Sequence, residues 1–162
     1  MSDTLLVYYS LEGNTEFVAE TAAAAADIDV QRLVPDKEPP KSGFGKFFWG
    51  GKSVVMHEMP KLMPQEHTAD KYSRVIIAFP IWAGSYPPAI ASYLAGNDLT
   101  GKEIWAIACS AGGNAEKAFA KLGEKLNGSG IKGTLSLTDP AKNKESSSVQ
   151  ITDFVNKIFA EK

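Results

Sequence analysis

The chain has 162 residues, close to the length of one ordinary domain, and 44% of them are hydrophobic. Its formal net charge of -2 excludes the polybasic surface that nucleic-acid-binding proteins carry. A single cysteine, Cys109, allows no internal disulfide, and no apolar run approaches the roughly 20 residues that span a bilayer. The first residues lack the basic and apolar segments of a signal peptide. We therefore expect a cytoplasmic protein without a membrane or nucleic-acid partner.

Short apolar runs alternate with helical patterns along the chain. In chain order, the expected elements are a strand at 5–9, a helix at 16–26, strands at 28–34 and 75–79, a helix at 87–95, a strand at 104–108, a helix at 115–126, a strand at 131–137 and a helix around 151–159. Several of these strands are continuously apolar, as strands buried on both faces are. The alternation predicts an α/β fold with a parallel sheet between two layers of helices. No repeat or linker interrupts it, so we expect a single domain over residues 1–162.

The last segment has the clearest helical periodicity. Its apolar residues recur at i, i+3, i+4, i+7 and i+8, which places them on one side of a helix. These residues are Ile151, Phe154, Val155, Ile158 and Phe159. The pattern predicts a helix that buries this face against the sheet.

Residues 36–68 interrupt the alternation. The segment begins with prolines and then places four aromatic residues among glycines: Phe44, Phe47, Phe48 and Trp49. Loops this long in compact domains are usually functional or disordered, and so many aromatic residues argue against disorder. Two interpretations stay open, a short amphipathic helix docked on the core and a flap over a ligand site.

The turn at residues 10–15 joins the first strand directly to the first helix. A helix N-terminus attracts phosphate through its unpaired N–H groups, and Ser10, Asn14 and Thr15 add side-chain donors. The turn contains no lysine or arginine, so neutral donors would hold the phosphate and Glu12 would point away. A dinucleotide fingerprint needs G-x-G-x-x-G, and only Gly13 is present, which favours a single phosphate. The alternative is that Asn14 or Thr15 merely caps the helix.

Two further turns lie at the same end of the predicted sheet. "PIWAGSYPP" at 80–88 follows the strand at 75–79, and "CSAGGN" at 109–114 follows the strand at 104–108. In parallel sheets, ligands bind beyond the carboxyl ends of the strands where the strand order reverses. Together the three turns offer phosphate donors, a flat aromatic side chain and backbone N–H groups. This combination suits a planar ring that carries a phosphate.

The motifs Ser-x-x-Gly-Asn-Thr, Pro-x-Trp-x-Gly and Ser-x-Gly-Gly, in this order after successive strands, resemble those of the flavodoxin-like FMN proteins. Flavodoxin is itself a known example of the strand-end rule applied above. The resemblance covers nearly the whole chain. It implies a flavodoxin-like three-layer sandwich, with a five-stranded parallel sheet of order 2-1-3-4-5 and helices on both faces. It also implies FMN bound noncovalently at the carboxyl ends of the strands.

By position, the resemblance implies that all three turns bind the cofactor: the first around the phosphate, the second beside the isoalloxazine ring and the third at its pyrimidine edge. The implied binding residues are Ser10, Leu11, Glu12, Gly13, Asn14, Thr15, Pro80, Ile81, Trp82, Ala83, Gly84, Ser110, Ala111, Gly112, Gly113 and Asn114. We expect no catalytic residue and no metal site. His57 and His67 lie apart and have no cluster of cysteines or carboxylates beside them, and Cys109 is expected to be a small core residue.

The implied function is low-potential electron transfer between redox partner proteins, a reductase and an acceptor. Two departures keep an alternative open, an FMN-dependent NAD(P)H:quinone reductase. The third turn, 110–114, contains no aromatic residue to cover the flavin, and the charge of -2 is mild for a protein that docks on basic partners. Both features would allow NAD(P)H or a quinone to stack on the flavin. A binding module of this fold without a flavin is the third possibility.

Overall fold

The computed structural model describes residues 2–38, 49, 51–52, 54, 56–112, 114–126 and 129–161. In chain order its elements are β1 (Thr4–Tyr8), α1 (Asn14–Ala25), β2 (Asp29–Arg32), a 3-10 helix (Ala69–Lys71), β3 (Arg74–Pro80), α3 (Pro88–Gly96), β4 (Glu103–Ser110), α4 (Glu116–Glu124), β5 (Ile131–Thr138) and α5 (Lys144–Ala160). The aromatic residues Phe44, Phe47 and Phe48 lie outside the described residues. Trp49 has helical backbone and is 42% exposed, so both interpretations of its segment stay open.

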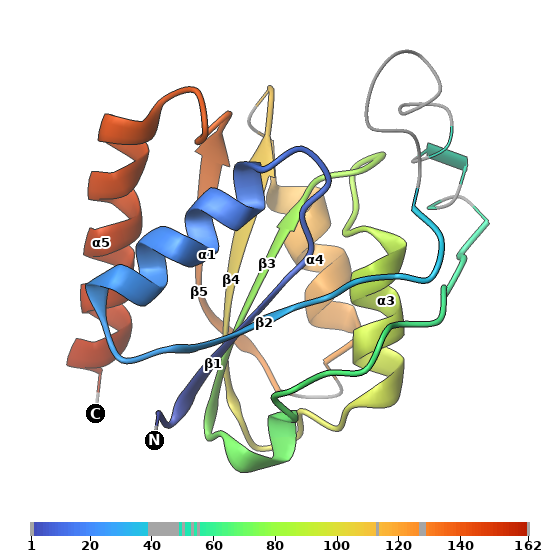
Figure 1. The fold of residues 1–162 in the computed structure, drawn as a ribbon, viewed down its shortest axis with the longest axis horizontal. Helices are drawn as coiled ribbons and strands as arrows, with labels where there is room; N and C mark the ends of the chain where they lie inside the picture. Colours follow the sequence, from blue (N-terminus) through green and yellow to red (C-terminus); the bar gives the residue numbers. More distant parts are fainter. Residues whose placement is uncertain are drawn as a thin grey trace.

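The five strands form one parallel sheet of order β2-β1-β3-β4-β5, which confirms the predicted fold and strand order. β1 lies between its two neighbours, so that Val7 is in register with Gln31 on one side and Ile77 on the other. Helices α1 and α5 cover one face of the sheet, and α3 and α4 cover the other (Figure 1). A buried parallel sheet needs this double cover because both of its faces are apolar.

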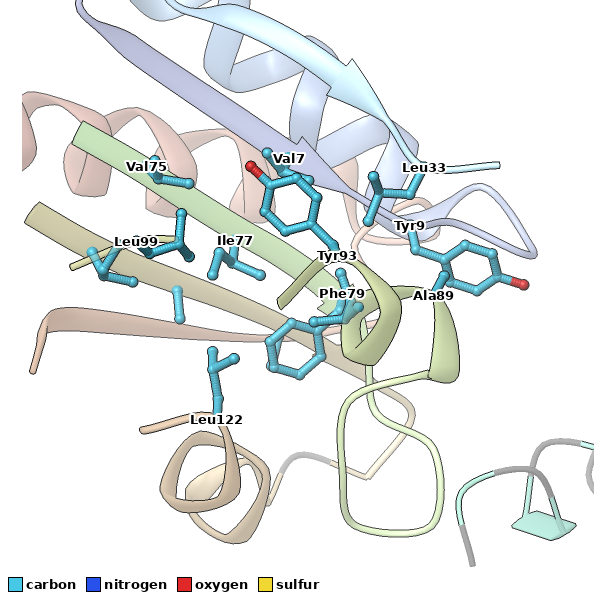
Figure 2. Close-up of a cluster of buried hydrophobic side chains, with 14 of the residues drawn as sticks. Val7, Tyr9, Leu33, Val75, Ile77, Phe79, Ala89, Tyr93, Leu99 and Leu122 are labelled. Atoms are coloured by element: carbon cyan, nitrogen blue, oxygen red, sulfur yellow. The ribbon is translucent and has the colours of Figure 1, made fainter. Parts of the chain in front are cut away.

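Side chains of each inner strand alternate between two cores. In and just after β1, Leu5, Val7 and Tyr9 belong to the core beneath α3 and α4, whereas Leu6 and Tyr8 belong to the core beneath α1 and α5. Figure 2 shows part of the first core, where side chains of β1 and β3 meet those of α3 and α4. The apolar runs in the sequence are continuous because successive side chains point to opposite faces of the sheet, and both faces are buried.

Several element bounds and one buried residue differ from the sequence-based expectations, and α5 begins at Lys144 and not near residue 151. Helix α1 begins at Asn14 instead of residue 16, which places Asn14 and Thr15 in its first turn. In α5 the side chains of Ile151, Phe154, Val155 and Ile158 are buried, but Phe159 is 37% exposed. The prediction that Phe159 joins the buried face is wrong, because its position falls at the edge of the apolar stripe. Its ring instead lies 5.3 Å from the guanidinium carbon of Arg74.

Strands β4 and β5 approach closely at one glycine. Gly133 pairs with Trp105, whose side chain is fully buried and meets the ring of Phe154 edge-on at 5.7 Å. A Cβ atom at position 133 would lie 2.5 Å from an indole carbon of Trp105. The indole therefore occupies the space that any larger residue would need.

We predict that Gly133→Ala lowers the free energy of unfolding by about 1–3 kcal/mol, the usual cost of overpacking a core. Denaturant titration measures this value. In a Trp105→Leu background the same glycine substitution should cost clearly less, because the clashing indole is gone. Equal costs in the two backgrounds would contradict the steric explanation.

Candidate functional site

A cavity of about 530 Å³ opens at the carboxyl ends of β1, β3 and β4. This volume lies within the range of typical small-molecule sites, roughly 300–1,000 Å³. The predicted site residues of all three turns line it, with two exceptions: Gly13, which is outside the lining, and Gly113, which lies outside the described residues. The structure thus brings together three turns that lie up to a hundred residues apart in the chain.

The first turn leads into an α1 N-terminus that has no side-chain cap. Gly13 is the N-cap residue, with φ of 100°, and the cap makes no side-chain hydrogen bond to the first turn. The Oδ1 atom of Asn14 instead accepts a hydrogen bond from the backbone N–H of Ala141, at 3.0 Å. Neither Asn14 nor Thr15 is a cap, so the alternative interpretation of this turn is wrong. The first-turn N–H groups stay available to an anion.

Ser10 shapes the same turn from its other end. Its Oγ atom accepts a hydrogen bond from the N–H of Gly13 at 3.1 Å, and the side chain is buried. Beside the turn, the Arg32 guanidinium forms an ion pair with Glu16 at 2.9 Å. Glu12 contributes to the cavity lining although its side chain is exposed.

The Thr15 hydroxyl is the most informative atom of the cavity. It is buried, and no hydrogen-bond partner for it exists among the described residues. Buried hydroxyls are normally paired, so an unpaired one that faces a cavity calls for a ligand. The neighbouring Cys109 sulfur is a poor hydrogen-bond partner and does not meet hydrogen-bond geometry with the hydroxyl, which therefore stays unpaired. Desolvation by burial raises the pKa of the Cys109 thiol to about 12, and a weak contact with the Thr15 hydroxyl lowers that pKa by less. Cys109 is therefore a neutral thiol at physiological pH, not a nucleophile.

The second turn is a tight hairpin held by two backbone hydrogen bonds, each 2.9 Å long, between Trp82 and Ser85. Its central residues Ala83 and Gly84 have φ of 48° and 72°, both in the left-handed region that two-residue hairpin turns of type I′ require. For Ala83 this conformation is strained, at a cost of about 1–3 kcal/mol. The turn places Trp82 in the cavity wall, with its ring edge-on to Tyr9 at 5.5 Å.

Three lining residues were missed by the sequence analysis: Gly51, Cys109 and Asp139. Asp139 directly follows β5, so the strand-end rule already indicated it, had it been extended to the last strand. Gly51 comes from the segment that interrupts the alternation. Among the described lining residues, two are acidic, Glu12 and Asp139, and none is lysine or arginine.

Other kinds of site receive no support from the described part of the chain. Its histidines, cysteine and carboxylates form no group of three that could hold a metal ion. His67 hydrogen-bonds Tyr72 at 2.8 Å, and Tyr72 in turn donates to Asp29 at 2.8 Å, which ties a loop to the edge strand. Within the same residues, no helix is both long and apolar enough to cross a bilayer.

We predict that Gly84→Ala lowers the free energy of unfolding by about 1–2 kcal/mol, since a Cβ atom is disfavoured at positive φ. The added methyl would also press on Lys117, whose Cδ atom lies 3.3 Å from its place. Gly112→Ala is the matched control in the same cavity, because its methyl would meet nothing within 4 Å and should change stability by less than about 0.5 kcal/mol. Equal losses in denaturant titrations would contradict the turn assignment.

Comparison with known proteins places the chain in a family. No curated protein matches the chain. Its structure is similar to a flavoprotein in complex with FMN from Lactobacillus acidophilus NCFM (20% identity, 90% of this chain and 99% of that chain, TM-score 0.72). It is also similar to a candidate flavoprotein from Bacteroides eggerthii DSM 20697, with 23% identity, coverage of 100% of both chains and a TM-score of 0.78. A third similar structure is oxidised Flavodoxin 1 from Bacillus cereus, with 16% identity, coverage of 99% of both chains and a TM-score of 0.58. A family model described as Flavodoxin matches residues 3–158, so the chain belongs to the flavodoxin family.

Proposed function

We propose that the chain binds FMN in the cavity at the strand ends and works as a low-potential electron carrier between redox partner proteins in the cytoplasm. The observation that carries this proposal is the buried, unpaired hydroxyl of Thr15 in the first turn of an uncapped helix. An FMN ligand in the structurally similar Lactobacillus acidophilus flavoprotein supports the choice of cofactor.

The phosphate of FMN fits the first turn. Thr15 would donate its hydroxyl hydrogen, and the first-turn N–H groups of α1 would add backbone donors and the positive end of the helix dipole. Because the side-chain oxygen of Asn14 already accepts a hydrogen bond from the Ala141 N–H, the side-chain NH₂ group of Asn14 is left as a further donor. Neutral donors thus replace the lysine or arginine that this lining lacks.

The ring of FMN fits the other two turns. Pro80, Ile81 and Trp82 supply an apolar and aromatic wall at the end of β3, and backbone N–H groups at the end of β4 can contact the polar edge of the ring. The strained Ala83–Gly84 turn fixes the backbone beside this wall. Such a site holds the ring and keeps water from one of its faces.

When bound, FMN supplies one- and two-electron redox chemistry. The protein's part is to hold the ring and to set the energy of adding negative charge to it. Asp139 contributes a carboxylate to the cavity lining, and no described lining residue is lysine or arginine, so this lining offers no direct counter-charge to an added electron. The protonated Cys109 thiol takes no part as a base. These features favour a low potential and an electron carrier that needs no acid or base of its own.

The phosphate assignment predicts a selective loss of FMN. Thr15→Val removes the unpaired hydroxyl and keeps the branched shape. A hydrogen bond to a charged group contributes roughly 1.5–3 kcal/mol, so FMN should bind on the order of ten- to a hundred-fold more weakly. Riboflavin, which has no phosphate, should bind unchanged, and the flavin-free protein should keep its stability. Isothermal titration calorimetry measures both affinities.

Thr21→Val is the matched control, since Thr21 lies in the same helix and donates its hydroxyl hydrogen to the Phe17 carbonyl oxygen at 2.8 Å, outside the cavity lining. It should leave both affinities unchanged. Equal weakening of FMN and riboflavin by Thr15→Val would show that the phosphate lies elsewhere.

The electron-carrier assignment predicts that NADPH and NADH do not reduce the FMN-loaded protein directly. Mixed without air with NADPH or NADH alone, it should keep its oxidised flavin absorbance. It should bleach when a catalytic amount of a flavodoxin reductase is added. Dithionite provides the control that the flavin is reducible. Rapid bleaching by NADPH or NADH alone would contradict the electron-carrier function and support the alternative, an FMN-dependent NAD(P)H:quinone reductase.

A further inference from the structure

A second cavity, of about 490 Å³, lies next to the proposed flavin site. Trp82 lines both cavities, so the two share one side chain as a wall. We call the second one the Tyr9 cavity, after the tyrosine in its lining. Nothing in the proposed function makes use of it.

The walls of the Tyr9 cavity are apolar and aromatic. Beside Tyr9 and Trp82 they include Pro35, Met59 and Ala89. Met59 is 63% exposed, although its side chain is fully apolar. Methionine adapts its shape to planar ligands, and an exposed one beside a concave aromatic wall is typical of a binding surface.

The cavity is built on a fixed frame. The backbone N–H of Asp36 donates to the Lys61 carbonyl oxygen at 2.8 Å, and Pro35 and Leu62 form an isolated antiparallel bridge. The Ser92 hydroxyl, on α3, donates to the Pro60 carbonyl oxygen at 2.6 Å. These bonds tie two distant chain segments to each other and to the helix layer. The site is therefore formed before any ligand arrives.

Tyr9 gives the cavity an unused polar group. The residue is only 2% exposed, yet its hydroxyl has no hydrogen-bond partner among the described residues. Figure 2 shows this hydroxyl directed away from the packed cluster. The edge-on contact with Trp82 holds the ring in place. A ligand oxygen would satisfy a group that the fold leaves unpaired.

The charges around the cavity select against strongly charged ligands. Lys37 and Lys61 lie in the lining together with Asp36 and Glu58, so the two signs balance. A phosphate-bearing compound finds no concentrated positive charge there. A neutral or singly charged aromatic compound does not need one.

We propose that the Tyr9 cavity binds a planar conjugated small molecule that presents a carbonyl oxygen to the Tyr9 hydroxyl. Its ring system lies between Trp82 and Met59, next to the flavin site and separate from it. The tyrosine O–H donates the hydrogen bond, and the apolar walls supply the contact area. The proposal does not require a flavin in the neighbouring cavity.

The test uses 9,10-anthraquinone-2-sulfonate as the probe and anthracene-2-sulfonate as a matched compound without the two carbonyl groups. Both are titrated calorimetrically into the full-length protein, with and without saturating FMN. We expect Tyr9→Phe to weaken anthraquinone-2-sulfonate roughly two- to ten-fold, the net effect of one hydrogen bond, and to leave anthracene-2-sulfonate unchanged. Tyr93→Phe is the control, because it removes another buried, unpaired hydroxyl that lines neither cavity.

A second pair of variants avoids any risk to folding. Met59→Ser should weaken both probes several-fold, whereas Met63→Ser, at a methionine that is 52% exposed and outside the lining, should weaken neither. Competition between FMN and the probe would place the probe in the flavin site and overturn the proposal. Absence of binding, or equal effects of Tyr9→Phe and Tyr93→Phe, would overturn it as well. If the chain fails to bind FMN, the flavin-free titration still decides this question by itself.

Discussion

After β1 the chain crosses to the face of the sheet that α1 covers, whereas after the neighbouring strand β3 it crosses to the face that α3 covers (Figure 1). The two connections therefore diverge and leave a space between them. This divergence is a constraint of strand order in a parallel sheet, and flavodoxin is a known example of it. It leaves the α1 N-terminus facing open space with its N–H groups uncapped. The cavity, its anion-binding donors and the position of Trp82 all depend on this topology.

The same constraint explains why the site can be neutral or acidic and still bind a phosphate. Backbone N–H groups at a helix N-terminus are fixed by the fold and need no counter-charge, so the turn tolerates Glu12. A lysine in their place would attract the phosphate but would also stabilise negative charge on a bound ring. Separating the two tasks, with backbone dipoles for the phosphate and no lysine or arginine in the remaining lining, suits the proposed electron carrier.

Much of this arrangement could be predicted from the sequence because it rests on local signals. The apolar runs predict β1, β3 and β4 because each run ends where polar or turn-forming residues begin. The residues that line the cavity follow each run directly in the sequence. Phe159 was misplaced because a periodic pattern gives the centre of a helical stripe more reliably than its edge. The Tyr9 cavity left no pattern at all, since its lining comes from separate stretches such as Tyr9, Pro35 and Met59. Their proximity depends on the long connection between β2 and β3, which no local signal describes.

Unpaired buried polar atoms occur both in the packed cores and beside the two cavities. Four such side-chain atoms occur among the described residues, on Tyr9, Thr15, Tyr93 and Trp105. Tyr93 and Trp105 lie in the packed cores and line neither cavity, so their cost is offset by the large apolar area that their rings bury. Thr15 and Tyr9 each line a cavity, and the two cavities meet at Trp82. An unpaired group beside a cavity can recover its hydrogen bond from a ligand, whereas one inside a packed core has no such partner. The cavities, and not the burial of the hydroxyls, therefore mark Thr15 and Tyr9 as binding groups.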